Sequence, residues 1–327
     1  MGPLENVQLG RTGVKVTRLG LGGAPMGALS LDVGIDIANE TLKKAYEEGV
    51  RYFDTAPLYG SGKSEVFFGE FLSTLDRDSF TLSSKVGRVL DGPYTPSGDS
   101  TNVNTSELKV SFDYSRDGVL RSIEESLVRL NLDRIDVALI HDPDDHYEEA
   151  LDTTFPTLAD LRSQGVIGAI GSGMNQWEML ADFARNADFD CFLIAGRYTL
   201  LDYSALTEFF PICEEKSISV ILGGPYNSGI LASDLGPEST YFYETAPQNV
   251  IEKAKSIRDI CNDFNIPLKA AALQFGLLHP VVAATIPGAR KPAEIAENVK
   301  MASINIPSDL WRNLKSTGLL PEQAPTD

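Results

Sequence analysis

Residues 115–141 read SRDGVLRSIEESLVRLNLDRIDVALIH, and they contain one complete helix–strand unit. From Arg116 to Leu130, apolar residues recur every three or four positions, which predicts an amphipathic helix with Ser115 as its cap. A short turn then leads into an apolar run at residues 136–140, which predicts a buried strand. Repeated units of this kind are typical of α/β proteins with a parallel sheet.

The same alternation continues along the whole chain. Further helices are predicted over residues 35–48 and 155–164, each followed by a glycine that favours a helix end. Short apolar runs predict eight strands, over residues 19–22, 52–54, 81–85, 136–140, 167–171, 191–195, 219–223 and 281–285. This number of strands favours a closed (β/α)₈ TIM barrel over an open sheet, although periodicity alone does not distinguish the two. We expect residues 1–327 to form a single α/β domain.

Three segments outside this repeat also have a predicted structure or role. Two short apolar runs at residues 7–9 and 14–17 flank the turn sequence GRTG, which predicts a β-hairpin that closes one end of the barrel. Two long connections follow the third and seventh predicted strands, at residues 86–113 and 224–247, and both are rich in glycine, proline, serine and aromatic residues. Long loops in compact domains are often functional, so we expect these two to border a binding site.

The composition excludes several classes of function. Forty-six acidic and 28 basic residues give a formal net charge of −18, which disfavours binding to nucleic acid and to anionic membrane surfaces. There is no apolar run long enough to span a bilayer, and MGPLENVQLG does not resemble a secretory signal, so a cytoplasmic location is expected. The three cysteines lack the spacing of a metal site. The sequence leaves the oligomeric state open.

Ionisable residues stand at the ends of three consecutive predicted strands. Asp54 ends the second strand, with Tyr59 shortly after it in FDTAPLYG; Lys85 ends the third strand, and His141 follows the fourth. Taken singly, each is more often a cap, a surface charge or a satisfied core residue. The carboxyl ends of barrel strands meet around one opening, however, so these four residues are expected to lie together there. This combination predicts a catalytic set for proton transfer.

At this point the sequence resembles the aldo-keto reductase family over nearly its whole length. The stretches that carry the resemblance are LGRTGVKVTRLGLGG, FDTAPLYG, SSKVGR, SIEESLVRLNLDRIDVALIHDPD, LRSQGVIGAIG, GGPYNSGIL and IPGARKPAEIAEN. The resemblance implies that Tyr59 transfers the proton, that Lys85 lowers the pKa of its phenol, that Asp54 pairs with Lys85, and that His141 positions the substrate oxygen. It also implies a barrel with a hairpin across its bottom and an extended dinucleotide.

The absence of a GxGxxG element after a strand agrees with a cofactor bound outside a Rossmann fold. The resemblance places the pyrophosphate on backbone amides of the loop after strand seven, at Tyr226, Asn227, Ser228, Gly229 and Leu231. It places the adenosine half at Ile286, Pro287, Gly288, Glu297 and Asn298. Without the resemblance, this last segment reads only as a strand, a turn and a helix.

The sequence departs from the family pattern around the nicotinamide. The departures are Gly173 and Met174 in place of Ser-Asn after strand five, Ala195 in place of a glutamine on strand six, and Gly223 in place of an aromatic residue at the end of strand seven. Ser172 and Asn175 are the predicted substitutes for the missing contacts.

Residues near the adenosine ribose predict a preference for NAD over NADP. Family members that favour NADP carry a lysine and an arginine at the positions of Gly288 and Glu294, so a 2′-phosphate would here meet a carboxylate instead of a cation. Arg290 and Lys291 are the opposing observation, because either could reach the phosphate, and NADP therefore stays possible.

The segments GRYTLLD and GGPYNSGIL resemble a branch of the family that oxidises free sugars such as L-fucose, D-threo-aldoses or L-galactose at C1, and a related group oxidises pyridoxal. Arg88, Asp142 and Trp177 are predicted to give the opening a polar lining for a sugar or aldehyde, although Trp177 could equally serve helix packing. An NADPH-dependent carbonyl reductase and a regulatory subunit with little turnover are the alternatives.

Overall fold

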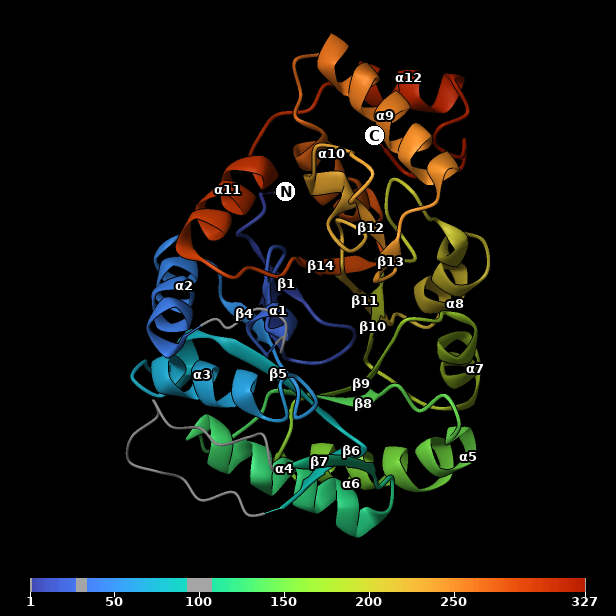
Figure 1. The fold of residues 1–327 in the computed structure, drawn as a ribbon. Helices are drawn as coiled ribbons and strands as arrows, with labels where there is room; N and C mark the ends of the chain where they lie inside the picture. The colour runs from blue at the N-terminus through green and yellow to red at the C-terminus, as the bar shows by residue number, and fades with distance from the viewer. Residues whose placement is uncertain (1, 28–33, 93–107, 327) are drawn as a thin grey trace.

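The computed structural model describes residues 2–27, 34–92 and 108–326 of the chain. Its centre is a parallel sheet with eight strands in chain order, and helices surround it (Figure 1). The strands are β3 (Leu21–Gly22), β4 (Tyr52–Asp54), β5 (Thr81–Val86), β8 (Val137–His141), β9 (Ala169–Met174), β10 (Cys191–Ala195), β11 (Ser219–Gly223) and β14 (Val282–Ile286). The bridges Leu19 to Thr285 and Gly22 to Gly288 join the two outer strands. The predicted (β/α)₈ fold is confirmed.

The helices form the outer layer of the molecule. In chain order they are α1 (Ala24–Gly27), α2 (Ile35–Glu47), α3 (Lys63–Leu72), α4 (Arg116–Leu130), α5 (Tyr147–Glu149), α6 (Phe155–Ser163), α7 (Glu178–Asn186), α8 (Phe209–Glu215), α9 (Gln248–Asp263), α10 (Leu268–Phe275), α11 (Pro292–Ala302) and α12 (Ser308–Ser316). The Ser115 hydroxyl accepts a hydrogen bond from Gly118 N at 3.1 Å and caps α4 as predicted. None of the described helices is both long enough and apolar enough to cross a bilayer.

Alternation along the strands divides the core into two parts. Side chains that point outward pack under the helices, whereas those that point inward fill the lower half of the barrel. The inward group includes Tyr52, Leu139 and Ile221, all with no exposed surface. Burial of one such large side chain contributes about 1.5–3 kcal/mol. The lower half of the barrel interior is therefore filled, and the interior opens toward the carboxyl ends of the strands.

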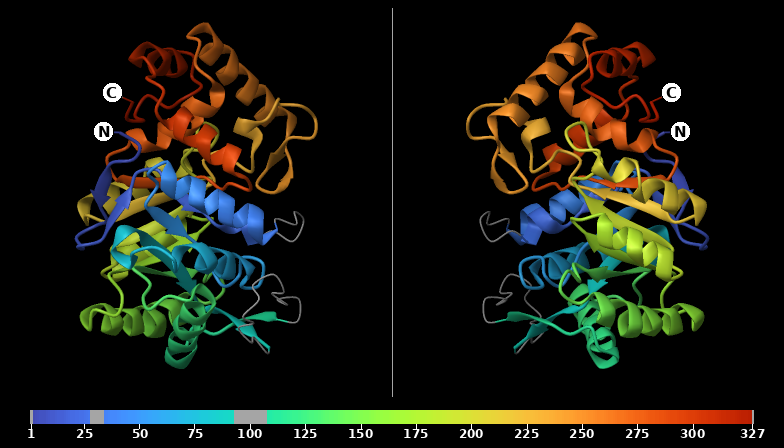
Figure 2. Two further views of the ribbon diagram at one scale, coloured as in Figure 1. Left: turned by 90° about the vertical axis from the view of Figure 1, so that its left-hand side faces the viewer. Right: turned by 90° about the vertical axis from the view of Figure 1, so that its right-hand side faces the viewer.

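The predicted hairpin closes the other end of the barrel. It consists of β1 (Asn6–Gln8) and β2 (Lys15–Thr17), which pair antiparallel and lie opposite the loops of the carboxyl end (Figure 2). Leu9 is fully buried and belongs to the inward core. The turn is fixed by Gly10, whose φ is +56° and whose amide donates to Ser219 Oγ at 2.8 Å. A side chain at residue 10 would collide with the backbone of Asp190, so the turn requires glycine.

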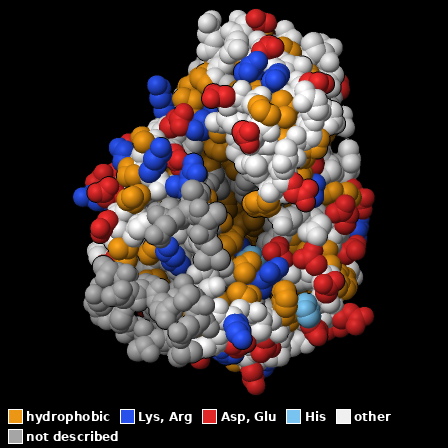
Figure 3. All heavy atoms as spheres, viewed as in Figure 1, with side chains coloured by type: hydrophobic (Ala, Val, Ile, Leu, Met, Phe, Trp, Pro, Cys, Tyr) orange, Lys and Arg blue, Asp and Glu red, His pale blue; other side chains and the backbone are white. Residues whose placement is uncertain are grey.

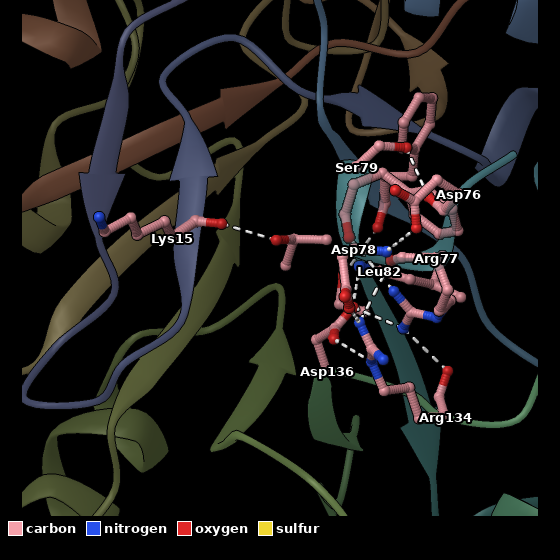
Figure 4. Close-up of polar contacts among 12 residues, drawn as sticks. Lys15, Asp76, Arg77, Asp78, Ser79, Leu82, Arg134 and Asp136 are labelled. Carbon is pink, nitrogen blue, oxygen red and sulfur yellow. Dashed lines mark hydrogen bonds and ion pairs between the residues drawn. The ribbon is translucent and has the colours of Figure 1, made fainter.

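An ion-pair network ties together the starts of β5 and β8 at this closed end (Figure 4). The Asp136 carboxylate accepts hydrogen bonds from Arg77 and from Leu82 N, both at 2.7 Å, and Arg134 also pairs with it. A hollow of about 610 Å³ lies between this network and the hairpin. Asp136 thus acts at the amino end of β8, away from the carboxyl ends that carry the predicted catalytic residues.

The fifth strand of the barrel, β9, differs most from its predicted residue range. It was expected at residues 167–171, but β9 runs from Ala169 to Met174. Gly168 N and Ala169 N both bond to Asp136 O, so residues 167 and 168 still belong to the incoming turn. The shift brings Ser172, Gly173 and Met174 into the strand itself, which decides where their side chains point.

Both long connections contain short hairpins that the sequence did not predict. In the first, β6 (Arg88–Asp91) pairs antiparallel with β7 (Lys109–Phe112), and residues 93–107 between them lie outside the described residues. In the second, β12 (Thr240–Tyr241) pairs with β13 (Glu244–Thr245). Each pairing covers only two to four residues per strand, which is too short for a period-two pattern to stand out.

Candidate active site

The predicted catalytic residues meet at the carboxyl end of the barrel. Asp54 and Lys85 occupy the uppermost inward positions of β4 and β5, and their side chains are only 1–2% exposed. Lys85 Nζ donates to Asp54 Oδ2 at 2.8 Å, to Asp54 Oδ1 at 3.0 Å and to Thr55 O at 2.8 Å. These contacts fix the ammonium in one place, next to the loop that carries Tyr59.

Tyr59 lies between the lysine and the histidine. Lys85 Nζ is 4.7 Å from the centre of the Tyr59 ring. The rings of Tyr59 and His141 are perpendicular, with their centres 5.9 Å apart. The structure therefore brings Asp54, Tyr59, Lys85 and His141 into one cluster of contacting groups.

The pKa of Tyr59 is set by two opposing effects. Burial raises it, the Lys85 ammonium lowers it, and the Asp54 carboxylate raises it again; together they raise the pKa of Tyr59 to about 12. Lys85 thus acts in the expected direction, but burial outweighs it in the protein without ligand. Tyr59 is consequently a neutral phenol at pH 7, in the form that donates a proton.

His141 is a neutral imidazole. Burial lowers its pKa well below 6.5, and the nearby cations Lys85 and Arg88 lower it further. Its Nε2 atom is 3.6 Å from Asp142 Oδ2, and its Nδ1 atom is buried without a hydrogen-bond partner. A buried polar atom without a partner is costly, so this nitrogen marks a place where a ligand group could bind.

Tyr114 holds the backbone beside His141. Its hydroxyl donates to His141 O at 2.7 Å and also lies 3.2 Å from Asp142 O. Asp142 has a φ of +39°, a conformation that a residue with a side chain adopts only when its surroundings hold it. This bend places the Asp142 carboxylate next to Arg88, at 3.1 Å.

The three predicted substrate residues do not all lie in one place. Arg88 and Asp142 form the ion pair just described, and the Arg88 guanidinium is 5.0 Å from the centre of the Phe112 ring. Trp177, in contrast, is the N-cap residue of α7 and packs against the outer core. Its position favours the helix-packing alternative.

Small residues line the side of the opening that faces Lys85. Gly173, Ala195 and Gly223 stand at the top of β9, β10 and β11. A Cβ atom at Gly173 would lie 3.5 Å from Lys85 Cε, and one at Gly223 would lie 3.4 Å from Leu193, which are ordinary contacts. The barrel is therefore open above Leu193, and Figure 3 shows a hollow with hydrophobic walls in this face of the molecule.

A model of the aldo/keto reductase family matches residues 18–318. The chain belongs to this family. The pyridoxal 4-dehydrogenase of Microbacterium luteolum is 38% identical over 97% of this chain and 98% of its own length. The D-threo-aldose 1-dehydrogenase of a Pseudomonas species is also 38% identical, over 94% of this chain and 96% of its own length. Like other aldo/keto reductases, the protein is an oxidoreductase, and this family uses nicotinamide cofactors.

Solved structures show the same fold. The glycerol dehydrogenase of Gluconobacter oxydans has a TM-score of 0.78 at 21% identity and covers 99% of this chain and 97% of its own. An aldo-keto reductase of Bacillus halodurans in its holo form has a TM-score of 0.76 at 24% identity and covers 98% and 99%.

The hollow suits the nicotinamide end of such a cofactor, but Ser172 does not reach it. Ser172 alternates with the inward glycines of β9, so it points outward, and its hydroxyl donates to Ile140 O at 3.0 Å with no exposed surface. The predicted contact from Ser172 is therefore corrected: this serine is structural. Asn175, the other predicted substitute, is exposed just beyond the strand, and its carbonyl accepts a bond from Arg197 Nε at 2.9 Å.

The loop after β11 is tightly wound. Asn227, Ser228 and Gly229 have φ angles of +46°, +56° and +99°. The amides of Asn227, Gly229 and Leu231 bond to Gly224 O, Tyr226 O and Tyr226 O, so in this conformation they are not free donors for a pyrophosphate. The expected role of these three amides therefore needs a rearrangement of the loop. The buried Asn227 Oδ1 atom, in contrast, has no partner.

Residues predicted for the adenosine half contact one another. Tyr226 donates to Asn298 Oδ1 at 2.7 Å and so connects the loop after β11 to α11. Glu294, at the start of α11, accepts bonds from Arg290 N at 2.8 Å and from its guanidinium at 3.0 Å. Ile286 ends β14, and Pro287 and Gly288 follow it, while Glu297 pairs with Lys269 at 2.6 Å. Among the described residues, no group of three potential ligands could hold a metal ion.

Several residues around the site were not singled out from the sequence. Tyr114 and Phe112 follow from the β6–β7 hairpin, which was not predicted. Phe242, at the tip of the β12–β13 hairpin, stacks on Arg197 at 4.1 Å. Aromatic enrichment of the two long loops was the only hint of these contacts.

Proposed function

We propose that the protein oxidises a free aldose at C1 to the corresponding lactone, with Tyr59 as the acid/base group. The observation that carries this proposal is the buried ion pair beside Tyr59, in which Lys85 Nζ lies 2.8 Å from Asp54 Oδ2. The chain that contains this pair is 38% identical to a D-threo-aldose 1-dehydrogenase. A single ammonium next to a phenol gives that phenol a route to its ionised form, which a general base requires.

Each residue has one task in this proposal. The cyclic aldose presents its C1 hydroxyl to Tyr59, which accepts the hydroxyl proton. Neutral His141 contacts the same substrate oxygen and orients it, and Lys85 stabilises the Tyr59 phenolate, while Asp54 holds Lys85. The bound cofactor supplies the hydride acceptor for C1.

The polar edge of the opening supports a sugar substrate. Arg88 and Asp142 together offer donors and acceptors next to His141, and a polyol needs both kinds of partner. The Arg88 Nε atom is buried without a partner and is available for a substrate hydroxyl.

Gly173, Ala195 and Gly223 would accommodate the nicotinamide ring, with Asn227 and Asn175 nearby for polar contacts. Tyr226, Ser228 and the segment from Ile286 to Asn298 would hold the remainder. The Glu294 carboxylate, which engages Arg290, supports NAD as the preferred form. We also propose that residues 1–327 form one domain, because the first and last strands pair with each other.

Pyridoxal oxidation is the second candidate. The pyridoxal 4-dehydrogenase of Microbacterium luteolum is 38% identical as well, and the exposed Phe112 ring beside Arg88 offers a stacking surface for an aromatic substrate. Carbonyl reduction remains the reverse alternative, which the neutral Tyr59 supports.

Steady-state turnover with a panel of substrates tests the proposal. L-fucose, L-galactose, D-arabinose and pyridoxal are compared with NAD⁺ and NADP⁺, and small aldehydes with NADH and NADPH. Aldose oxidation with the highest kcat/KM supports the proposal. Pyridoxal turnover with inert aldoses selects the second candidate, and aldehyde reduction alone selects the carbonyl reductase.

A further inference from the structure

Beneath the catalytic residues, two hydroxyls continue the hydrogen-bonded chain into the barrel. Ser83 Oγ lies 2.7 Å from Asp54 Oδ1, and Tyr52 OH lies 3.0 Å from Ser83 Oγ. Tyr52 and Ser83 have no exposed surface, and Asp54 is 2% exposed. Both hydroxyls belong to the inward face of the barrel, two residues below Asp54 and Lys85 on their strands.

Counting protons fixes the direction of these bonds. An ionised carboxylate only accepts, so the single proton of Ser83 points at Asp54. The other acceptor within reach of Ser83 is Phe53 O, at the longer distance of 3.4 Å. Tyr52 must then donate to Ser83. Hydrogen bonds in such a chain strengthen one another, most of all in a dry interior.

We propose that Tyr52 and Ser83 are positioning residues, which hold the Asp54 carboxylate in place and thereby set where the Lys85 ammonium stands relative to Tyr59. This inference rests on the proposed role of Tyr59 for its kinetic consequence only. The hydrogen-bonded chain from Tyr52 through Ser83 to Asp54, called the relay below, ends in the barrel core, so it carries no proton to solvent. Its function is to give the Asp54 carboxylate a second hydrogen-bond donor, Ser83, in addition to Lys85.

The charged and titratable groups around the relay make its effect predictable. Four titratable groups on the surrounding strands and the loop after β4 interact electrostatically with Asp54. They are Tyr52, Tyr59, Lys85 and Cys191. Tyr59 in turn faces Lys85, Asp54, Asp142 and the neutral His141. Without the hydrogen bond from Ser83, the Asp54 carboxylate interacts more strongly with the Lys85 ammonium. The ammonium then stabilises the Tyr59 phenolate less.

Ser84 provides a matched control. It neighbours Ser83 on β5, is 2% exposed, and points to the opposite face, where it donates to Glu65 Oε1 at 2.7 Å. Glu65 is paired with Arg129 at 2.6 Å in a separate buried cluster under α3 and α4. Ser84→Ala thus removes the same atom at the same depth without touching Asp54.

The first measurement needs no substrate. In unliganded protein labelled with ¹⁵N-lysine, the ammonium signal of Lys85 is assigned by its loss in Lys85→Met. We expect this signal to shift in Ser83→Ala and, less, in Tyr52→Phe, and to stay unchanged in Ser84→Ala. An unchanged Lys85 signal in both relay variants overturns the proposal. Tyr52→Phe keeps the buried ring, so it serves as the test if Ser83→Ala does not fold.

The second measurement is kinetic. Ser83→Ala should lower kcat at pH 7 about fivefold or more with KM within about twofold, and should displace the rising limb of the oxidation pH profile upward by the equivalent amount, about 0.7 unit or more. Ser84→Ala should change neither quantity. A kcat loss that changes the slope of the profile between pH 7 and about pH 9.5, instead of displacing the whole profile, contradicts the relay. If the Lys85 signal shifts in a protein that oxidises no aldose, the relay stands and the proposed function fails.

Discussion

The Lys85 ammonium lies 2.8 Å from the Asp54 carboxylate, and the two side chains are 1% and 2% exposed. Such a pair is costly to break, because the remaining charge stays buried without compensation. We expect Lys85→Met to destabilise the protein by about 3–5 kcal/mol, measured by urea unfolding. The double variant Asp54→Asn/Lys85→Met should regain part of that loss. Equal stabilities of the single and double variants would contradict this coupling.

Tyr59→Phe removes the one atom that the proposed mechanism uses for proton transfer. We expect kcat to fall by about 10² or more, with cofactor affinity and unfolding midpoint nearly unchanged. Tyr46→Phe, on α2 outside the site, is the matched control and should retain full activity. Near-native turnover by Tyr59→Phe would remove Tyr59 from the mechanism.

The high pKa of Tyr59 predicts the pH dependence of oxidation. Because burial raises it to about 12 against the opposing effect of Lys85, the phenolate is the minor form below that pH, and its share grows about tenfold per unit. The kcat/KM for aldose oxidation should therefore rise continuously from pH 7 to about pH 9.5. Reduction, which uses the neutral phenol, should not rise over the same range. A plateau of the oxidation rate below pH 8 would argue for a different base.

Two glycines of β9 make a contrasting pair. The position of Gly173 has room for a side chain, whereas a Cβ at Gly171, one layer deeper, would lie 2.5 Å from Leu139 and 2.6 Å from Cys191 O. Gly173→Val should fold normally but bind the cofactor at least about tenfold more weakly, whereas Gly171→Ala should lower the unfolding midpoint. Calorimetric titration and thermal unfolding measure the two effects. Unchanged cofactor affinity in Gly173→Val would place the nicotinamide elsewhere.

Cofactor choice depends on the pair of Arg290 and Glu294. With its guanidinium 3.0 Å from Glu294, Arg290 is already engaged, so we expect NAD⁺ to be favoured over NADP⁺ by more than about tenfold in kcat/KM. Glu294→Gln should relax this preference by freeing Arg290, with NAD⁺ activity as its internal control. Higher efficiency with NADP⁺ in the unmodified protein, lost in Arg290→Ala, would show that Arg290 binds the phosphate.

The sequence predicted those parts of the site that depend on strand ends. Strands at residues 52–54, 191–195 and 219–223 were placed correctly, and those at 81–85 and 136–140 to within one residue. The meeting of Asp54, Lys85 and His141 followed from the second, third and fourth strands. Ser172 was misassigned because its strand continues three residues beyond the predicted end, to Met174, so Ser172 lies within the strand and on its outward face.

Other features could not be predicted because they depend on distant partners. Nothing in the local sequence indicates that Ser83 bonds to Asp54 while Ser84 bonds to Glu65, since the two serines differ only in which face of β5 they occupy. The wound loop after β11 depends on three consecutive positive φ angles, of which those of Asn227 and Gly229 are suggested by residue type and that of Ser228 is not. Local pattern thus predicts elements, and packing between elements decides hydrogen-bond partners.

The hairpin of β1 and β2 also limits the directions from which a ligand can enter the barrel. With Leu9 and Val16 filling the floor of the barrel, the chamber above them is blind-ended. Ligands of the residues at the carboxyl ends of the strands therefore approach from the side opposite the hairpin. The turn at Gly10, which holds this hairpin in place, thus helps to decide the direction from which ligands reach the site, although it lies on the far side of the barrel.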